Sequence, residues 1–598
     1  MSLCGYYKLQ MDRTRSRWLI SVTSACSSWA DKGMQRSEAW AARGIQQCHS
    51  GLCTAWYRVA NSVMQGCYVV ARLVCLLGVN LVNVFWLLIT QLRWGVCRLV
   101  NPNKKKQDRI EHVFVLMLEN RSFDHMLGLS NIQGIDAISG QPTTIEGLST
   151  NNNWNADPHG NAIVASAPAP WAMLHDPGHE FEDVREQLCG KGGDYPHINN
   201  SGFVTRYSHV DPEHPGEIMK CYSPEQLPVL TTLAQEFAVC DHWFSSMPGP
   251  TWPNRFFVHA ASSGGLDHSP SRLDAADAVL FNGYQFENGT IYDRLDDEDL
   301  NWTIYKGDAF PQALAINGMN VRALEGYFKD FEDFSSDVNH PGYATSYAFI
   351  EPNYGHAAAN FTCGNSQHPL DDVTRGDRLV KTVYETIRNS PHWASSVLII
   401  TYDEHGGFYD HVHPPQTVAP GDAITDPGNT LNAFRFTQLG VRVPAVVVSP
   451  LIPNGVIDHT CYDHASVLAT LEAFWGLQPL TQRDKHANTL QHLFSLSAPR
   501  TDAPTTLHEP AHSGIHCEDD TEEGIGGTIL AGDAAKATEP VDSSREGFLH
   551  VAFLRDLHTS SPEEREQRTA KYLQVSSRLD AKQYMDEVRT KVEPDHTT

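Results

Sequence analysis

The feature that most constrains the fold is a short apolar run that ends in two adjacent carboxylates. Residues 395–400 have the length and β-branched content of a buried strand, and Asp403 and Glu404 follow almost at once. Adjacent acids repel each other unless a cation or hydrogen-bond donors neutralise them. In open α/β sheets, ligands bind at the carboxyl ends of the strands. We therefore expect Asp403 and Glu404 to hold a divalent metal ion at such an edge.

Other apolar runs alternate with helical patterns along the chain. A first strand is expected over 110–118, and it ends at Glu119 and Asn120. Further strands are expected at 302–305, 347–350 and 443–448, and helices at 227–239, 377–389 and 467–474. Strands that alternate with helices predict an α/β fold with a doubly wound, mostly parallel central sheet and helices on both faces.

The charge of the chain is unevenly distributed. Residues 1–107 hold 14 Lys and Arg and 3 Asp and Glu, which leaves 31 basic and 68 acidic residues in the other 491. An acidic body argues against a nucleic acid partner, because phosphate backbones need basic surfaces. It is compatible with a cation-dependent enzyme, whose bound metal reverses the local field.

The basic region 1–107 contains an apolar segment at 73–91, with 19 residues and no charged side chain. This length approaches the ~20 residues that a helix needs to cross a bilayer. We expect a transmembrane or anchor helix there, and membrane association through it. Arg72 and Arg93 flank the segment, so its orientation stays open. The alternative is an amphipathic or buried helix, with the true start of the chain further along.

Two more regions complete the predicted organisation. Residues 108–498 are expected to form the catalytic domain, and 499–598 a linker followed by a helical tail. The linker is rich in Pro, Thr, Gly, Asp and Glu. In the tail, one helical face is expected to pack on the body, through Ala581, Tyr584, Met585 and Val588. The Cys residues lack CxxC spacing, so a zinc finger has no support, while disulfides are permitted.

Thr251 is the candidate nucleophile. Pro248, Pro250 and Pro253 restrict the backbone around it, and a hydroxyl held beside a metal ion is activated for attack on phosphorus. The oxygen-rich candidate ligands suit Ca²⁺, Mg²⁺ or Mn²⁺, and nearby His residues also admit Fe or Zn. Asn254 and Arg255 follow Thr251 and are predicted to hold phosphoryl oxygens.

Several segments, in order, resemble the phosphoesterase family that contains plant non-specific phospholipases C, bacterial phospholipases C and a group of acid phosphatases. The resemblance covers about 110–490, and its motifs lie at 119–125, 176–179, 251–255, 403–412 and 440–450. It implies an alkaline-phosphatase-like fold. It also implies metal ligation by Glu119, Asn120, Thr251, Asp403 and Glu404.

The resemblance further implies a mechanism. Thr251 would attack phosphorus and form a phospho-threonine that water then hydrolyses, while histidines stabilise charge and protonate the leaving alcohol. His179 and His368 are the best placed, with His411 and His464 as secondary candidates.

We therefore expect a hydrolase acting on ester bonds. The favoured activity is phospholipase C-type cleavage of phospholipid head groups, and the alternative is an acid phosphatase acting on small phosphate esters. A non-catalytic membrane-anchored binding protein of the same fold is the remote alternative. A membrane-associated, extracytoplasmic or secreted location is expected from the apolar segment, four glycosylation sequons and the lipid-type substrate.

Overall fold

The computed structural model describes residues 109–149, 153–270, 283–355, 361–425, 430–517, 539–541 and 543–593. These residues belong to one compact unit that runs from Asp108 to Thr598. The predicted anchor helix at 73–91 lies outside the described residues. Within them, no helix combines the length and the apolar character that a membrane crossing requires.

A ten-stranded sheet forms the centre of the unit, in the order β3-β2-β12-β6-β11-β10-β1-β9-β7-β8. Six of the nine neighbouring pairs are parallel, and the pairs β10–β11, β11–β6 and β2–β3 are antiparallel. The strands are β1 (His112–Leu118), β2 (Gln133–Asp136), β3 (Pro142–Thr144), β6 (Ala238–Cys240), β7 (Trp302–Lys306), β8 (Phe328–Asp330), β9 (Tyr347–Glu351), β10 (Ser396–Tyr402), β11 (Ala445–Val448) and β12 (Val456–Asp458). A separate hairpin joins β4 (Trp154–Ala156) to β5 (Ala162–Val164).

The two central strands are mainly apolar because both of their faces are covered. Every residue of β1 and of β10 is buried, as expected for parallel strands with helices on both sides. The register pairs Leu118 with Tyr402, so both chains leave the sheet at the same edge. The polar residues that follow β1 and β10 are therefore brought together.

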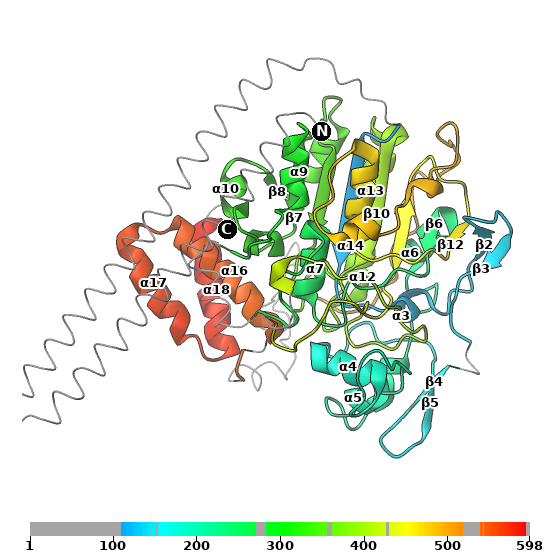
Figure 1. Cartoon of the computed structure of the whole chain (residues 1–598), viewed down its shortest axis with the longest axis horizontal. Coiled ribbons are helices and arrows are strands. Elements are labelled where there is room, and N and C mark those ends of the chain that lie inside the picture. Colours follow the sequence, from blue (N-terminus) through cyan, green and yellow to red (C-terminus); the bar gives the residue numbers. More distant parts are fainter. Residues whose placement is uncertain are drawn as a thin grey trace, which may run out of the picture. The chain divides into compact units, whose positions relative to one another are not determined.

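Helices cover the sheet in two groups, seen around the central strands in Figure 1. One group contains α7 (Thr251–Ala260), α9 (Ile291–Asp297) and α13 (Ala465–Trp475), and the other contains α6 (Pro228–Glu236), α11 (Phe334–Asn339) and α12 (Val373–Arg388). Shorter helices are α3 (Phe123–Leu127), α4 (Phe181–Cys189), α5 (Phe203–Tyr207), α10 (Met319–Leu324) and α14 (Gln482–His486). The 3₁₀ turns are η1 (Pro215–Met219), η2 (Gln312–Ala315), η3 (Phe331–Asp333), η4 (Trp393–Ser395), η5 (Ala423–Thr425) and η6 (Gln491–Leu493). The predicted α/β class with a mostly parallel sheet is confirmed.

One predicted element is wrong at its end. The helix expected over 227–239 stops at Glu236, and residues 238–240 form strand β6 between β11 and β12. Ala238, Val239 and Cys240 continue an apolar helical pattern, so periodicity does not separate them from α6. Their pairing with two distant strands decides their conformation.

Three C-terminal helices pack together, and the first of them contacts the turn η2 of the body. They are α16 (Ser543–Thr559), α17 (Pro562–Gln574) and α18 (Arg578–Val592), shown in orange and red in Figure 1. The four α18 residues predicted to share a packing face are all buried. Phe548 of α16 lies 5.4 Å from Trp252, ring centre to ring centre. The preceding segment is held by a disulfide between Cys363 and Cys517.

Candidate active site

The turns after β1 and β10 are joined by hydrogen bonds. The backbone N–H of Asn120 donates to Oδ1 of Asp403 (2.9 Å), and that of Arg121 donates to the carbonyl of Glu404 (2.9 Å). Gly406 has a φ of 63°, and a Cβ there would lie 2.2 Å from the Asn120 carbonyl oxygen. Only glycine therefore permits this approach, which brings Asn120 beside the carboxylates.

Thr251 is the first residue of α7, and its hydroxyl faces Asn120. Its Oγ1 donates to Oδ1 of Asn120 over 3.1 Å, and the side chain is 7% exposed. The start of a helix carries unpaired N–H groups and a positive partial charge, which favours a phosphoryl group there. The hydroxyl thus lies where a helix start meets the ends of β1 and β10.

Asn254 and Arg255 hold these parts in place. The Asn254 side chain donates to the carbonyls of Met247, Gly249 and Pro250 and accepts from the Met247 N–H, so it shapes the loop before Thr251. Arg255 donates from Nε to Oδ2 of Asp403 (2.9 Å) and from Nη2 to the Leu118 carbonyl (3.0 Å). Its Nη1 has no hydrogen-bond partner among the described residues. Of the two predicted phosphoryl ligands, Arg255 therefore retains a donor that could serve the role.

The carboxyl groups near Thr251 have too few partners to stabilise their charged forms. Among the described residues, Oε2 of Glu119 and Oε1 of Glu404 are buried and accept no hydrogen bond. Burial is the main cause that raises the pKa of Glu119 well above its usual range and that of Glu404 to about 8. Asp403 accepts three hydrogen bonds, from the N–H groups of Asn120 and Glu404 and from Arg255. A carboxylate has about four acceptor positions, so Asp403 keeps one.

By the chemistry of its donor atoms, this set suits a hard divalent cation. It offers free oxygens on Glu119 and Glu404, a remaining position on Asp403, and the side-chain oxygens of Asn120 and Thr251. Oxygen ligands of this kind suit ions such as Mg²⁺ or Ca²⁺. A cation would also offset the repulsion that burial and clustering impose on these acids.

Two histidines near the site have opposite electrostatic surroundings. His179 shares a 2.8 Å hydrogen bond between Nδ1 and the Pro177 carbonyl, and its Nε2 lies 3.5 Å from Nδ2 of Asn120. Burial lowers its pKa, but Glu404, Asp176 and Glu180 outweigh this and raise it to about 10. His368 stacks on Phe361 with ring centres 3.9 Å apart. Burial, followed by the charge of His179, lowers the pKa of His368 well below its usual value. These surroundings favour the charged form of His179 and the neutral form of His368.

Comparison with known proteins places this arrangement in a family. Residues 110–478 match the model of the phosphoesterase family. The chain belongs to the phosphoesterase family. It is 38% identical to non-specific phospholipase C6 of Arabidopsis thaliana over 422 residues, which cover 68% of this chain and 76% of that protein. It is 27% identical to phospholipase C B of Mycobacterium tuberculosis over 435 residues, which cover 67% and 80%.

The match to solved structures is weaker. A protein of the alkaline phosphatase superfamily from Vibrio parahaemolyticus is 14% identical, with a TM-score of 0.26, covering 44% of this chain and 64% of that one. The assignment to the phosphoesterase family therefore rests on the sequence matches. At that level, the prediction of an enzyme that hydrolyses phosphoesters is confirmed.

In this phosphoesterase, His411 lies in a different cluster from the one around Thr251. Ligand atoms of Asp124, Asp410 and His411 lie within 4.8 Å of one another, close enough to bind a metal ion. Arg442 already supplies a cation there, with 2.9 Å contacts to both Asp124 and Asp410. His411 in turn lies 2.7 Å from Asp124. The cluster is therefore a buried ion-pair network that positions the turn after Glu404.

Sequence reasoning missed residues that hold the site together. Arg121 is buried and donates from Nε to the Gln367 carbonyl (2.7 Å) and from Nη2 to the His368 carbonyl (3.2 Å). It thereby links the turn after β1 to the segment that carries His368. Its place within the 119–125 motif was the available signal. His464, a secondary candidate, lies with Nε2 2.6 Å from the Asp403 carbonyl and supports that turn.

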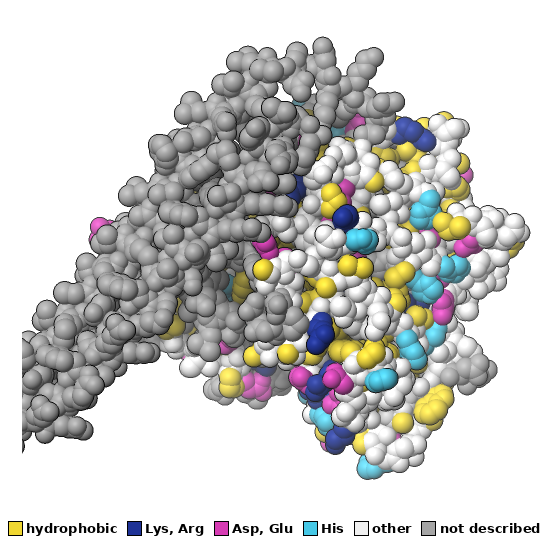
Figure 2. All heavy atoms as spheres, viewed as in Figure 1, with side chains coloured by type: hydrophobic (Ala, Val, Ile, Leu, Met, Phe, Trp, Pro, Cys, Tyr) yellow, Lys and Arg dark blue, Asp and Glu magenta, His cyan; other side chains and the backbone are white. Residues whose placement is uncertain are grey.

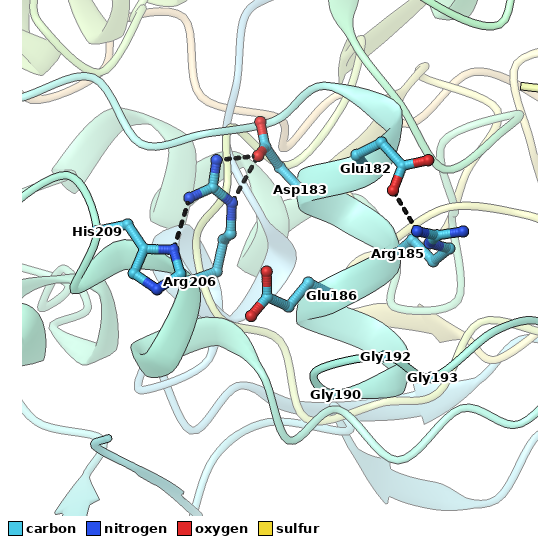
Figure 3. A pocket seen from close by; sticks show the side chains of 9 residues that line it. All are labelled: Glu182, Asp183, Arg185, Glu186, Gly190, Gly192, Gly193, Arg206 and His209. Atoms are coloured by element: carbon cyan, nitrogen blue, oxygen red, sulfur yellow. Dashed lines mark hydrogen bonds and ion pairs between the residues drawn. The ribbon is translucent and has the colours of Figure 1, made fainter. Parts of the chain in front are cut away.

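A surface hollow of about 220 Å³ lies between α4 and α5, with its charged lining shown in Figure 3. The charges are largely paired within it: Arg206 with Asp183, and Arg185 with Glu182. Asp183 also accepts the backbone N–H of Glu180 (3.0 Å). The contacts of Asp183 therefore stabilise the start of α4, which follows directly after His179. Elsewhere on the described face in Figure 2, Lys and Arg side chains are scattered singly.

Proposed function

We propose that this phosphoesterase is a phospholipase C, which cleaves the bond between the phosphorylated head group and the lipid alcohol. The observation that carries the proposal is the Thr251 hydroxyl, which is bound to Asn120 at the start of α7 beside carboxylate oxygens that lack partners. The names of the relatives, non-specific phospholipase C6 and phospholipase C B, support this substrate class.

A divalent cation is part of the proposal. Glu119, Asn120, Thr251, Asp403 and Glu404 would hold it, and its identity among Ca, Mg, Mn, Fe and Zn stays open. Such an ion, when bound, lowers the pKa of a neighbouring hydroxyl and offsets negative charge on the phosphoryl oxygens.

The chain's own residues divide the remaining work. Oγ1 of Thr251 gives up its proton to solvent and attacks phosphorus, the bond to the lipid alcohol breaks, and phospho-threonine forms at Thr251. The cationic His179 gives its proton to the departing alkoxide and stabilises negative charge beside it. A water molecule then attacks phosphorus and gives up one proton, the bond between phosphorus and Oγ1 of Thr251 breaks, and Oγ1 takes up a proton as the phosphorylated head group leaves. We assign to neutral His368, whose ring stacks on Phe361, the role of accepting the proton of that water.

The decisive test compares Thr251→Ala with wild-type protein on phosphatidylcholine vesicles. Loss of a nucleophile lowers turnover by about 10⁴-fold or more. Thr231→Ala is the matched control, because Thr231 is a buried threonine in α6. Wild-type turnover by Thr251→Ala would refute the mechanism. Turnover of a simple aryl phosphate but not of phosphatidylcholine would instead favour the acid phosphatase, and no turnover with no bound metal would favour a binding protein.

Membrane association and location rest on the sequence. We propose that residues 73–91 attach the protein to a membrane and that the body lies in an extracytoplasmic or secreted setting. Fractionation of the full chain beside a chain lacking residues 1–107 tests the attachment. Equal recovery of both in the soluble fraction would refute it.

A further inference from the structure

A buried glutamine contacts the candidate metal site from outside the sequence motifs. Gln312 begins the turn η2 and is 2% exposed. Its Nε2 lies 3.4 Å from Oε1 of Glu119, to which it donates a hydrogen bond. The other oxygen of Glu119, Oε2, is one of the two free carboxylate oxygens of the site. Gln312 thus binds Oε1 of Glu119 and leaves the other oxygen, Oε2, without a partner.

The backbone of Gln312 is held by a carboxylate at the end of a neighbouring strand. Glu351 is the last residue of β9, which pairs directly with β1. Its two oxygens accept the backbone N–H groups of Gln312 (2.7 Å) and Ala313 (2.9 Å). The Tyr354 hydroxyl donates to the same carboxylate over 2.8 Å. Two N–H groups on one carboxylate fix the turn, and with it the direction of the Gln312 side chain.

Space filling alone does not account for a glutamine at this position. Oε1 of Gln312 has no hydrogen-bond partner among the described residues, and its amide donates its one described hydrogen bond to Glu119. A buried polar atom without a partner costs about 1–3 kcal/mol. An apolar side chain of the same size would avoid that cost. The hydrogen bond to Glu119 therefore accounts for an amide at this position.

We propose that Gln312 is a positioning residue of the metal site, held by Glu351, and that it orients Glu119 for a divalent cation. The inference rests on the proposed function, because it requires the cation. By donating to Oε1, Gln312 keeps Glu119 in the rotamer that leaves Oε2 free toward the ion. Residues that orient a metal ligand in this way typically contribute 10–100-fold to metal affinity.

The test measures metal binding to the full chain after removal of metal with a chelator. Mn²⁺ and Ca²⁺ are titrated by calorimetry into wild type, Gln312→Met and Asn320→Leu. Gln312→Met removes the amide with little change in volume. Asn320→Leu is the matched control, because Asn320 is buried and its amide donates to the Leu314 carbonyl of the same turn. We expect Gln312→Met to weaken affinity about 10–100-fold, and Asn320→Leu to keep it within about threefold.

A second variant keeps the inference testable if Gln312→Met does not fold. Glu351→Gln retains one of the two acceptors for the turn, and we expect it to weaken metal affinity by a smaller factor. Activity of Gln312→Met should recover at saturating metal, which a purely structural defect would not allow.

The outcomes separate the inference from the function on which it rests. Unchanged affinity in Gln312→Met, or an equal loss in Asn320→Leu, would overturn the role of Gln312 alone. Wild-type protein that binds none of the ions would overturn the proposed metal site itself.

Discussion

Arg255 is the residue whose removal should cost the most stability near the site. Its guanidinium is 1% exposed, and the Asp403 carboxylate that it contacts at 2.9 Å is fully buried. It also donates to the carbonyls of Met117 and Leu118 at the end of β1. Arg255→Met keeps much of the side-chain volume and removes all three contacts.

The expected loss follows from what the substitution leaves behind. Breaking a buried ion pair by removing one partner costs about 3–5 kcal/mol, because the other charge stays buried without compensation. Here the abandoned charge on Asp403 lies beside two further carboxyl groups, Glu119 and Glu404, and the charges of Asp403 and Glu404 both raise the pKa of Glu119. We therefore expect a fall in the free energy of unfolding of about 4 kcal/mol in metal-free protein.

The assay is guanidinium unfolding in the presence of a chelator, so that bound metal does not contribute. A double-mutant cycle with Asp403→Asn isolates the pair. Removing both charges should cost at least about 1 kcal/mol less than the sum of the two single losses. Additive losses, or a loss below about 1 kcal/mol for Arg255→Met, would refute the view that Asp403 depends on Arg255 for its charge.

Two further predictions concern the surroundings of the site. Burial lowers the pKa of His411, but the hydrogen bond and charge of Asp124 outweigh it, so the folded pKa is raised. Its contribution is therefore complete below the unfolded pKa of about 6.5 and is lost as pH rises through the folded value. His411→Gln should lose about 1 kcal/mol more at pH ~5.5 than at pH ~9 by denaturant unfolding, and an equal loss at both would contradict this. At Gly547 of α16, an added Cβ would lie 2.2 Å from Cε2 of Trp252, so Gly547→Val should lower stability by about 1–3 kcal/mol. It should also reduce turnover, because Trp252 follows Thr251 in α7. An unchanged melting temperature would show that α16 does not depend on the close approach of Gly547 to Trp252.

Much of the central architecture could be predicted because it is encoded locally. Apolar, β-branched runs such as 397–400 need burial on both faces, and that requirement yields parallel strands with helices on either side. The parallel pairing of β1 with β10 then brings Asn120 to Asp403 without further information. Asn120, Thr251 and Asp403 are linked by hydrogen bonds because their motifs lie at two strand ends and at the start of a helix.

The tertiary structure decided the roles of side chains whose partners are distant in sequence. Asn254 holds the loop before Thr251, and His411 joins Asp124 and Arg442, although both stand in motifs that suggest chemistry. Gln312 has no motif at all, and its contact with Glu119 spans 193 positions. A residue's type and its neighbours in the chain determine which contacts it can make. The close packing of segments far apart in sequence determines which contacts it does make, and only the folded chain contains that information.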